Sequence, residues 1–507
     1  MRTNKNKYPD YTAEIEALEK DGFSIELLRR IITKHRENSK YNKKLIDRYE
    51  VLADGVPIFD RKPRFDSEKA INNHLNNDHF SEIIDFKTGY FAGNPIAYSY
   101  SHAEESKDDT GDVGDSEAEQ DAAVEAATKA LTDFVTRSNM FDVDMECTKF
   151  AAICGYSGRL FYIDKNGDER VMVVPPNECI ILSKTRDITQ PTFGVRYYTV
   201  TDIHDNTVYK AEFYNDDTIY YAEGGSVDAL EVKKEAPNLF DCCPLQGIPN
   251  NREMMGDAEK VLSLIDAFDR SMSDANNELE SFAHAYMVFK NLYIEEKEKE
   301  EAQFSGSIEF QSNGQTDSDV YFLTKNINDG FIEHHLDRIE KGIYKYSKTP
   351  NLSDETFGTA SGIALRFKLT GLEAKCGTFE AKMISAGTYM FALLANVWAK
   401  NKQIKVDPLQ CTMSFKRNFP LDLVSEAQAA QAMIAAGVPK RVAFEMAFSG
   451  IDDIEYVMQL VEEEKESIPG YPDDNDDDDD NEEPTSLMIG RNNKWLKPPV
   501  EELPEGE

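Results

Sequence analysis

Few residues of this chain have the types and spacing of a metal or catalytic site. His334 and His335 are adjacent, and neighbours on a helix point about 100° apart, so they cannot share one ion as residues four apart can. The stretch from Asp164 to Glu169 has the composition of a calcium loop, but its glycine comes too early and Pro175 stands where the glutamate ligand belongs. Its Asn-Gly pair favours a β-hairpin turn instead. The sequence therefore predicts no metal site and no cofactor.

Motifs for nucleotide hydrolysis or nucleophilic catalysis are absent from the sequence. It contains no GxxxxGK[ST], GxSxG or HExxH pattern, and no cysteine pair with zinc-site spacing. The seven cysteines are scattered and odd in number, which predicts buried, reduced thiols in a cytoplasmic chain. These absences exclude a P-loop motor, and we expect a protein that is not an enzyme.

The charge of the chain argues against a conventional nucleic-acid-binding surface. Its formal net charge is −37, whereas affinity for nucleic acid comes mainly from lysine and arginine. Residues 462–507 contain 17 acidic and 4 basic side chains, and this composition predicts a disordered acidic tail over 468–507. A second acidic stretch, 101–125, predicts a disordered or surface insertion. The longest apolar run, 390–399, is too short to span a bilayer, and the sequence shows no signal peptide, so we expect a soluble protein with no membrane partner.

Periodicity predicts an α+β fold that is predominantly helical. In the first 250 residues, helical patterns cover 11–51, 67–90 and 126–153, a hairpin covers 159–174, and strand-like runs cover 193–200, 208–214 and 218–222. In the second half, long helices are predicted over 254–290, 329–346 and 361–400, with a strand near 320–324 and two or three short helices over 421–466.

The helix predicted over 361–400 is the longest, with a length of about 60 Å. Its apolar residues recur in steps of three and four, and a helix of this length favours an extended assembly with lateral neighbours. Four seam residues are predicted to pack in the core and between subunits: Leu365, Leu369, Leu372 and Phe379. A polar, helix-breaking loop, 347–360, separates this helix from the preceding one.

Four segments resemble the portal proteins of tailed bacteriophages, in that family's order. They are KTGYFAGNPI at 87–96, 248–282, 350–375 and 435–464. The first is similar to portals of long-tailed phages of Gram-positive hosts. Matching positions in the second include Pro249, Asn251 and Asp257. The third is the closest, with matches at Asp354, Phe357, Gly358, Ser361, Gly362, Ala364, Leu365 and Leu372.

The resemblance implies the portal fold of wing, stem, clip and crown, with a ring around a central channel. It divides the chain into a wing (1–250, with the insertion 101–125), a first stem helix (251–290), a clip (291–326), a second stem helix (327–346), a tunnel loop (347–360), a long wing helix with the following strand (361–420), a crown (421–467) and the acidic tail (468–507). Six loop residues would line the DNA channel: Lys348, Asn351, Leu352, Asp354, Glu355 and Phe357. Leu352 and Phe357 would either contact the lumen or anchor the loop.

The resemblance also implies partners. Twelve copies would form a ring at one capsid vertex, through which double-stranded DNA is packaged and ejected. The large terminase subunit would dock first and a head-completion or adaptor protein later, with scaffold and major capsid protein around the ring. The chain would reside in the virion, and in the host cytoplasm during assembly. An acidic wall would let DNA slide without being held.

Two other classes of protein could contain long helices of this kind. A DNA-processing enzyme such as a terminase needs a P-loop, which the sequence lacks. A cytoplasmic helical scaffold or adaptor protein of phage assembly, without a DNA channel, would share the long helices but not the ring. Ring formation separates that alternative from a portal.

Overall fold

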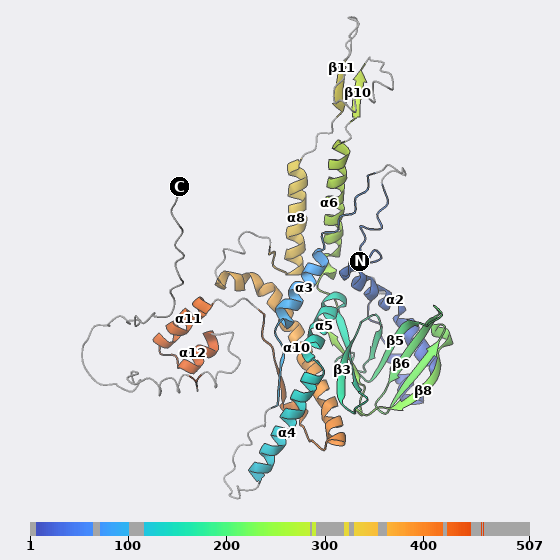
Figure 1. Ribbon diagram of the computed structural model, residues 1–507, viewed down its shortest axis with the longest axis vertical. Helices are drawn as coiled ribbons and strands as arrows, with labels where there is room; N and C mark the ends of the chain where they lie inside the picture. Colours follow the sequence, from blue (N-terminus) through green and yellow to red (C-terminus); the bar gives the residue numbers. More distant parts are fainter. Residues whose placement is uncertain are drawn as a thin grey trace, which may run out of the picture. The chain divides into compact units, whose positions relative to one another are not determined.

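The computed structural model describes residues 7–63, 71–100, 116–283, 286–290, 319–323, 329–352, 362–418, 423–447, 458 and 460. The chain divides into two units, 1–422 and 423–507. Helices and strands are both well represented in the larger unit, which confirms the α+β prediction (Figure 1).

The N-terminal helices cover a five-stranded antiparallel sheet. Helices α1 (Thr12–Asp21) and α2 (Ile25–Tyr49) confirm the two helices predicted there. The strands of the sheet follow their order in the chain, β4-β5-β6-β7-β8. They are β4 (Cys179–Leu182), β5 (Phe193–Thr201), β6 (Thr207–Tyr214), β7 (Thr218–Gly224) and β8 (Glu231–Pro237). The short helix η2 (Val227–Ala229) precedes β8. Leu28 and Ile31 of α2 pack with Val195 and Phe213 of the sheet, so one sheet face is buried by the helices.

A smaller sheet lies next to this layer, in the order β3-β2-β9. Strands β2 (Tyr156–Ile163) and β3 (Glu169–Val174) form the predicted hairpin, and Gly167 in its turn has φ +87°. Strand β9 (Leu245–Pro249) pairs antiparallel with β2, so Tyr156 lies opposite Pro249. This pairing places the residues after β9 beside the end of α5 (Met140–Cys154), the helix that precedes β2.

Three helices of the first half differ in extent from their predictions. Helix α3 (His79–Ala92) begins twelve residues later than predicted, because backbone N–H groups of the preceding stretch bond to side chains of a distant helix. Leu75 N donates to Ser273 Oγ at 3.0 Å, and Asn77 N donates to Asp269 Oδ1 at 3.0 Å. The helix predicted over 126–153 is two helices, α4 (Ser116–Arg137) and α5 (Met140–Cys154), separated where Asn139 takes φ +47°. Because α4 begins at Ser116, the last ten residues of the predicted acidic insertion are helical.

Two antiparallel helices, α6 (Leu262–Ala283) and α8 (Asp329–Ser347), lie side by side (Figure 1). Ile265 and Phe268 of α6 share a core cluster with Ile339 and Ile343 of α8. The prediction for α8 is confirmed, but the helix predicted over 254–290 is too long at both ends. Helix α6 starts only after the short helix η3 (Glu259–Val261). At the other end, residues Tyr286–Lys290 form strand β10 and not helix. Strand β10 pairs with β11 (Asp319–Leu323), the strand predicted near 320.

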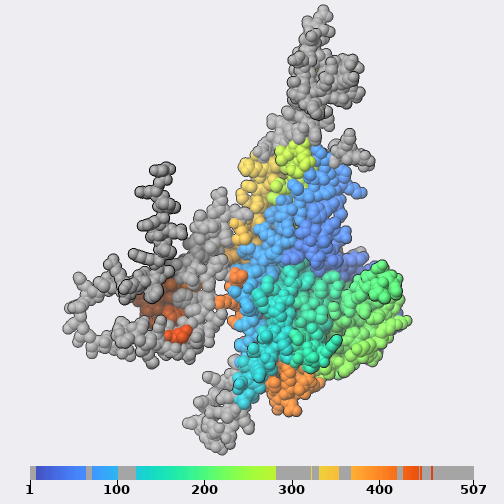
Figure 2. Space-filling model, in the orientation of Figure 1, coloured from blue at the N-terminus to red at the C-terminus, as the bar shows by residue number. Residues whose placement is uncertain are grey.

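The 40-residue helix α10 (Gly362–Asn401) confirms the longest predicted helix. Figure 1 shows that it is bent along its length. After the short helix η4 (Pro408–Gln410), strand β12 (Cys411–Ser414) returns along it and pairs with β1 (Ala97–Tyr100). In Figure 2 the orange segment near residue 400 lies on the surface, next to the cyan residues.

The second unit contains α11 (Leu423–Ala435) and α12 (Lys440–Ala447). Gly437, with φ +87°, lies between them, and the two helices agree with the short helices predicted over 421–466. Of the range predicted as crown, residues 421–422, 448–457, 459 and 461–467 lie outside the described residues, and so does the acidic tail 468–507.

Candidate functional site

The predicted tunnel loop is described only at its first residues. Lys348, Asn351 and Leu352 are described, whereas Asp354, Glu355 and Phe357 lie outside the described part of the chain. Thr349 N donates to Tyr344 O at 3.2 Å, and Lys348 takes the left-handed φ of +59°. This arrangement is a helix-terminating motif that more often places glycine at the left-handed position. Asn351 Nδ2 donates to Glu340 Oε1 at 3.2 Å, so the loop leaves α8 in a defined direction.

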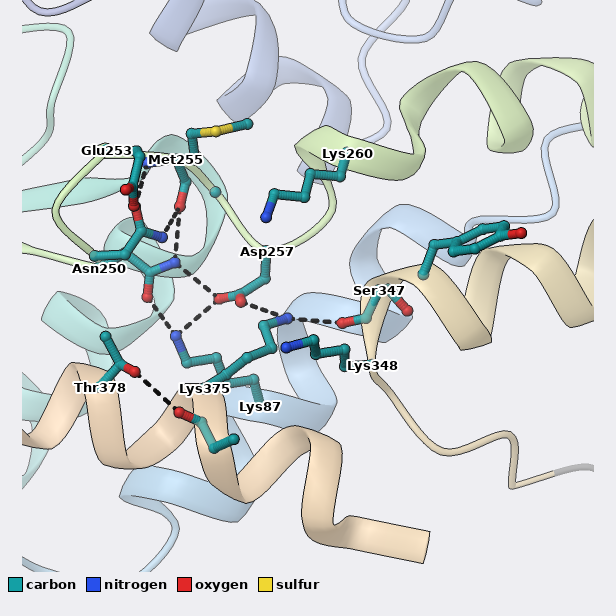
Figure 3. Close-up of a pocket in the computed structure, with 14 residues that line it drawn as sticks. Lys87, Asn250, Glu253, Met255, Asp257, Lys260, Ser347, Lys348, Lys375 and Thr378 are labelled. Atoms are coloured by element: carbon teal, nitrogen blue, oxygen red, sulfur yellow. Dashed lines mark hydrogen bonds and ion pairs between the residues drawn. The ribbon is translucent and has the colours of Figure 1, made fainter.

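A buried carboxylate joins three elements at the base of this loop. Asp257, in the segment between β9 and α6, accepts from Lys87 Nζ of α3 at 2.8 Å and from Lys375 Nζ of α10 at 2.5 Å (Figure 3). The Asp257 and Lys87 side chains are 2% and 1% exposed. Lys375 Nζ also donates to Ser347 O, the last carbonyl of α8, at 2.9 Å. The Lys87–Asp257–Lys375 node therefore links α3, α10 and the end of α8 to one side chain.

Two asparagines shape the segment that carries Asp257. Asn250 accepts a hydrogen bond from Lys87, and its Nδ2 donates to Met255 O at 2.8 Å. Asn251 Oδ1 accepts from Met255 N at 3.0 Å, and its Nδ2 donates back to Met255 O at 2.8 Å. Asp257 N donates to Ala152 O at 2.7 Å. Two of the residues matched in the sequence, Asn251 and Asp257, thus hold this turn against α5.

Asp257 is charged in the folded chain. Burial alone would raise its pKa, but the charges and hydrogen bonds of Lys87 and Lys375 outweigh burial, so the pKa lies below the ordinary value of 3.8. A carboxylate with a pKa lower in the folded chain than in the unfolded chain stabilises the fold above its unfolded pKa. That contribution is lost as the pH falls through the folded pKa.

The pKa shift leads to a prediction about acid stability. We expect the difference in unfolding free energy between the wild-type chain and Asp257→Asn to be constant from about pH 5 to 7 and to shrink below 3.8. Urea unfolding followed by circular dichroism at a series of pH values measures this difference. A difference that stays unchanged down to the pH at which the wild-type chain unfolds would contradict the assignment.

A second ion cluster fixes α10 one turn from the node. Arg417, after β12, bonds to Glu373 Oε1 at 2.9 Å and to Glu380 Oε2 at 2.6 Å. Tyr90 OH of α3 donates to Glu373 Oε2 at 2.9 Å. Burial would raise the pKa of Glu373, but hydrogen bonds from Arg417 and Tyr90 and the charge of Arg417 outweigh it and lower the pKa. Tyr90 thus joins α3 to α10 near Lys375, and Arg417 joins the segment after β12 to the same part of α10.

The seam residues of α10 lie in the core of a single chain. Leu369, Leu372 and Phe379 are 4%, 0% and 0% exposed, packed among residues of the same chain. Burial in the core is thus confirmed for these three residues, whereas their packing between subunits stays a prediction. The side chain of Leu365 lies outside the described part of the structure.

Other apolar residues of the long helices are exposed instead. They include Leu279 of α6, Phe331 and Tyr346 of α8, and Phe367 and Ile384 of α10, and Leu352 after α8 is exposed as well. Phe367 was not predicted from the sequence, because this residue does not belong to the row of apolar positions that recur in steps of three and four along the helix. An aromatic residue on the polar side of an amphipathic helix was the available signal.

The described ranges hold neither a metal-binding cluster nor a helix suited to a membrane. Within them, no group of three or more His, Cys, Asp or Glu side chains is placed to bind a metal ion. None of the helices described there has the length and apolar composition needed to cross a membrane.

Comparison with known proteins identifies the family. Residues 28–470 match the family described as Phage portal protein, SPP1 Gp6-like. The chain is 24% identical over 339 residues to the portal protein of Bacillus phage SPP1, a match that covers 63% of this chain and 61% of that protein's length. It is 21% identical over 451 residues to the portal protein of Clostridium phage phiCD119, covering 84% of this chain and 90% of that protein. These matches confirm the resemblance found in the sequence, and the chain belongs to the phage portal protein family.

Proposed function

We propose that the chain forms a closed ring at one capsid vertex, twelve subunits in the virion, through which double-stranded DNA is packaged and ejected. The observation that carries this proposal is the family match over residues 28–470. The long antiparallel helices α6 and α8 support it, because helices with exposed apolar side chains are stabilised by lateral neighbours, which a closed ring supplies without open ends.

The proposed parts of the portal follow the described elements. Helices α6 and α8 would form the stem, and the β10–β11 hairpin would belong to the clip. The second unit, with α11 and α12, would form the crown. The clip would dock the large terminase subunit during packaging and a head-completion or adaptor protein afterwards. Scaffold and major capsid protein would contact the ring during assembly in the host cytoplasm.

The proposed channel function depends on charge and on the tunnel loop. A chain with a net charge of −37 presents negative groups to a polymer that carries one charge per about 1.7 Å, so DNA would slide without being held. The loop 347–360 would reach the lumen with Lys348, Asn351, Leu352, Asp354, Glu355 and Phe357. The Lys87–Asp257–Lys375 node would hold the base of that loop in place. The ring would act as a passive conduit, and a separate motor would supply the energy.

Ring formation tests this proposal. We expect the purified full chain to form closed rings of about a dozen subunits, seen in negative-stain images and by native mass spectrometry. Replacing Phe367 with aspartate should weaken the rings without unfolding the subunit, because this side chain is 76% exposed in the single chain.

The matched control is Ile203→Asp, at a turn position that is 94% exposed and far along the chain from the long helices. It introduces the same charge at an exposed apolar site and should leave the rings intact. Monomers or dimers of the wild-type chain across a range of concentration and salt would contradict the proposal and favour the scaffold or adaptor alternative.

A further inference from the structure

A cavity opens beside the Lys87–Asp257–Lys375 node. Its volume is about 270 Å³, and its lining comes from α3, the segment between β9 and α6, the end of α8 and α10 (Figure 3). Four separate stretches of the chain thus meet around one solvent-accessible space.

The lining of this cavity is basic in an otherwise acidic protein. It includes four lysines and two carboxylates: Lys87, Lys260, Lys348, Lys375, Glu253 and Asp257. The formal charge of the lining is therefore positive, whereas the whole chain carries −37. A cation would meet an excess of ammonium groups here, so the charge favours an anionic ligand.

Two of the four ammonium groups are already committed. Lys87 and Lys375 share the carboxylate of Asp257, at 2.8 and 2.5 Å. In the described part of the chain, Lys260 and Lys348 form no ion pair. Both side chains point towards the Asp257 side of the cavity in Figure 3. These two ammonium groups can therefore donate to a ligand without breaking an existing salt bridge.

The position of Lys348 is set by its backbone. Its left-handed φ of +59° follows from the way α8 ends, and its stem lies against α10 at Gly371, where an added Cβ would be 3.4 Å from Lys348 Cβ. A lysine whose backbone is fixed loses less freedom when it binds a ligand. The site is thus partly arranged before any ligand arrives.

We infer that this cavity binds a phosphate-type oxyanion, held mainly by Lys260 and Lys348 with Lys375 beside them. Several lysine ammonium groups around one small space suit the dispersed charge of phosphate oxygens. The ligand has two possible sources: free inorganic phosphate, or a backbone phosphate of DNA. Only the second source rests on the proposed function. A bound oxyanion would bridge the first residue of the loop to the turn that precedes α6.

The test is a titration of the full chain with inorganic phosphate at constant ionic strength, followed by isothermal calorimetry and ³¹P NMR. We expect saturable binding at one site per subunit. Lys260→Met and Lys348→Met should each weaken binding about tenfold, because each removes one charge-assisted contact, and the double variant should abolish it. Lys341→Met, on the exposed side of α8, is the matched control and should bind as the wild-type chain does.

A second arm distinguishes the two sources. A short DNA duplex that displaces phosphate in the wild-type chain, but does not bind the double variant, assigns the site to backbone phosphates. Phosphate binding that the duplex leaves unchanged assigns it to the free ion. Absence of saturable binding, or equal binding by the double variant, overturns the inference. Because ring formation is scored separately, such a failure leaves the proposed function untouched.

Discussion

Replacing Asp257 with alanine should lower the free energy of unfolding by about 3–5 kcal/mol. The substitution leaves the ammonium group of Lys87 inside the protein, where its side chain is 1% exposed, without its carboxylate partner. It also removes the carboxylate partner of Lys375, which keeps its hydrogen bond to Ser347 O, and one partner of Asn250. A buried charge without a partner costs far more than the pair contributes when intact, and this asymmetry gives the large expected effect.

Urea unfolding of the full chain, with and without the substitution, measures the change. Lys87→Met is the companion variant: it removes the buried cation but leaves Asp257 paired with Lys375, so its loss should be clearly smaller. Asp337→Ala controls for an ordinary exposed pair, because Asp337 bonds Lys341 on the surface of α8, and it should cost about 0–1 kcal/mol. If Asp257→Ala costs no more than Asp337→Ala, the node does not stabilise the base of the loop.

Replacing both Asp354 and Glu355 with lysine should slow or stall DNA packaging. The change removes two negative charges per subunit and adds two positive ones, and a ring repeats it in every copy. If the loop lines the channel as proposed, the added lysines form a ring of positive charge that faces the DNA phosphates. The delay should ease as salt is raised, because screening weakens contacts between ammonium and phosphate groups. Packaging rates in an assembled motor reaction, measured at several salt concentrations, test this.

The matched control is the pair Asp228→Lys and Glu235→Lys, which makes the same charge change on exposed residues of η2 and β8. It should package at the unmodified rate. Both double variants should form normal rings, so that assembly and DNA passage are scored separately. An unmodified rate for the loop variant at low salt would show that the loop does not line the channel.

Periodicity in the sequence was sufficient to locate the long helices. The steps of three and four predicted α8 and α10 to within a few residues, and the Asn166-Gly167 pair located the β2–β3 hairpin. Periodicity also identified the buried face of α10. It could not say whether that face meets the same chain or a neighbour, since both partners require the same apolar spacing.

The predicted helix limits were wrong where residues far along the chain determine the local structure. Residues 71–78 carry a helical pattern, yet Asn73, Leu75 and Asn77 donate their backbone N–H groups to side chains of α6. Likewise, Tyr286–Lys290 continues the apolar pattern of α6 but is paired as a strand with β11. Hydrogen-bond partners this far along the chain leave no local signal, so helix limits there could not be predicted.

The Lys87–Asp257–Lys375 node at the base of the loop could not be predicted from the sequence either. Asp257 is one of the positions that match the family, and Lys87 and Lys375 lie at the ends of two other matched segments, but nothing in the sequence links these three residues, which are far apart along the chain. Only the packing of α3 and α10 around the segment between β9 and α6 brings their ammonium groups to one carboxylate.

The anchoring of Lys348 against Gly371 sets a tether length for the segment between them. Fourteen residues separate Ser347 from Gly362, and at most they extend about 48 Å. The first turns of α10, up to Gly371, add about 14 Å. A segment pinned at both ends can extend no farther than half its contour, so no residue of the loop can lie more than about 31 Å from this anchor. Deleting residues between Lys348 and Gly362 would therefore shorten the maximal reach by about 1.7 Å per residue, so in the proposed ring the loop length would set how far each loop extends into the channel.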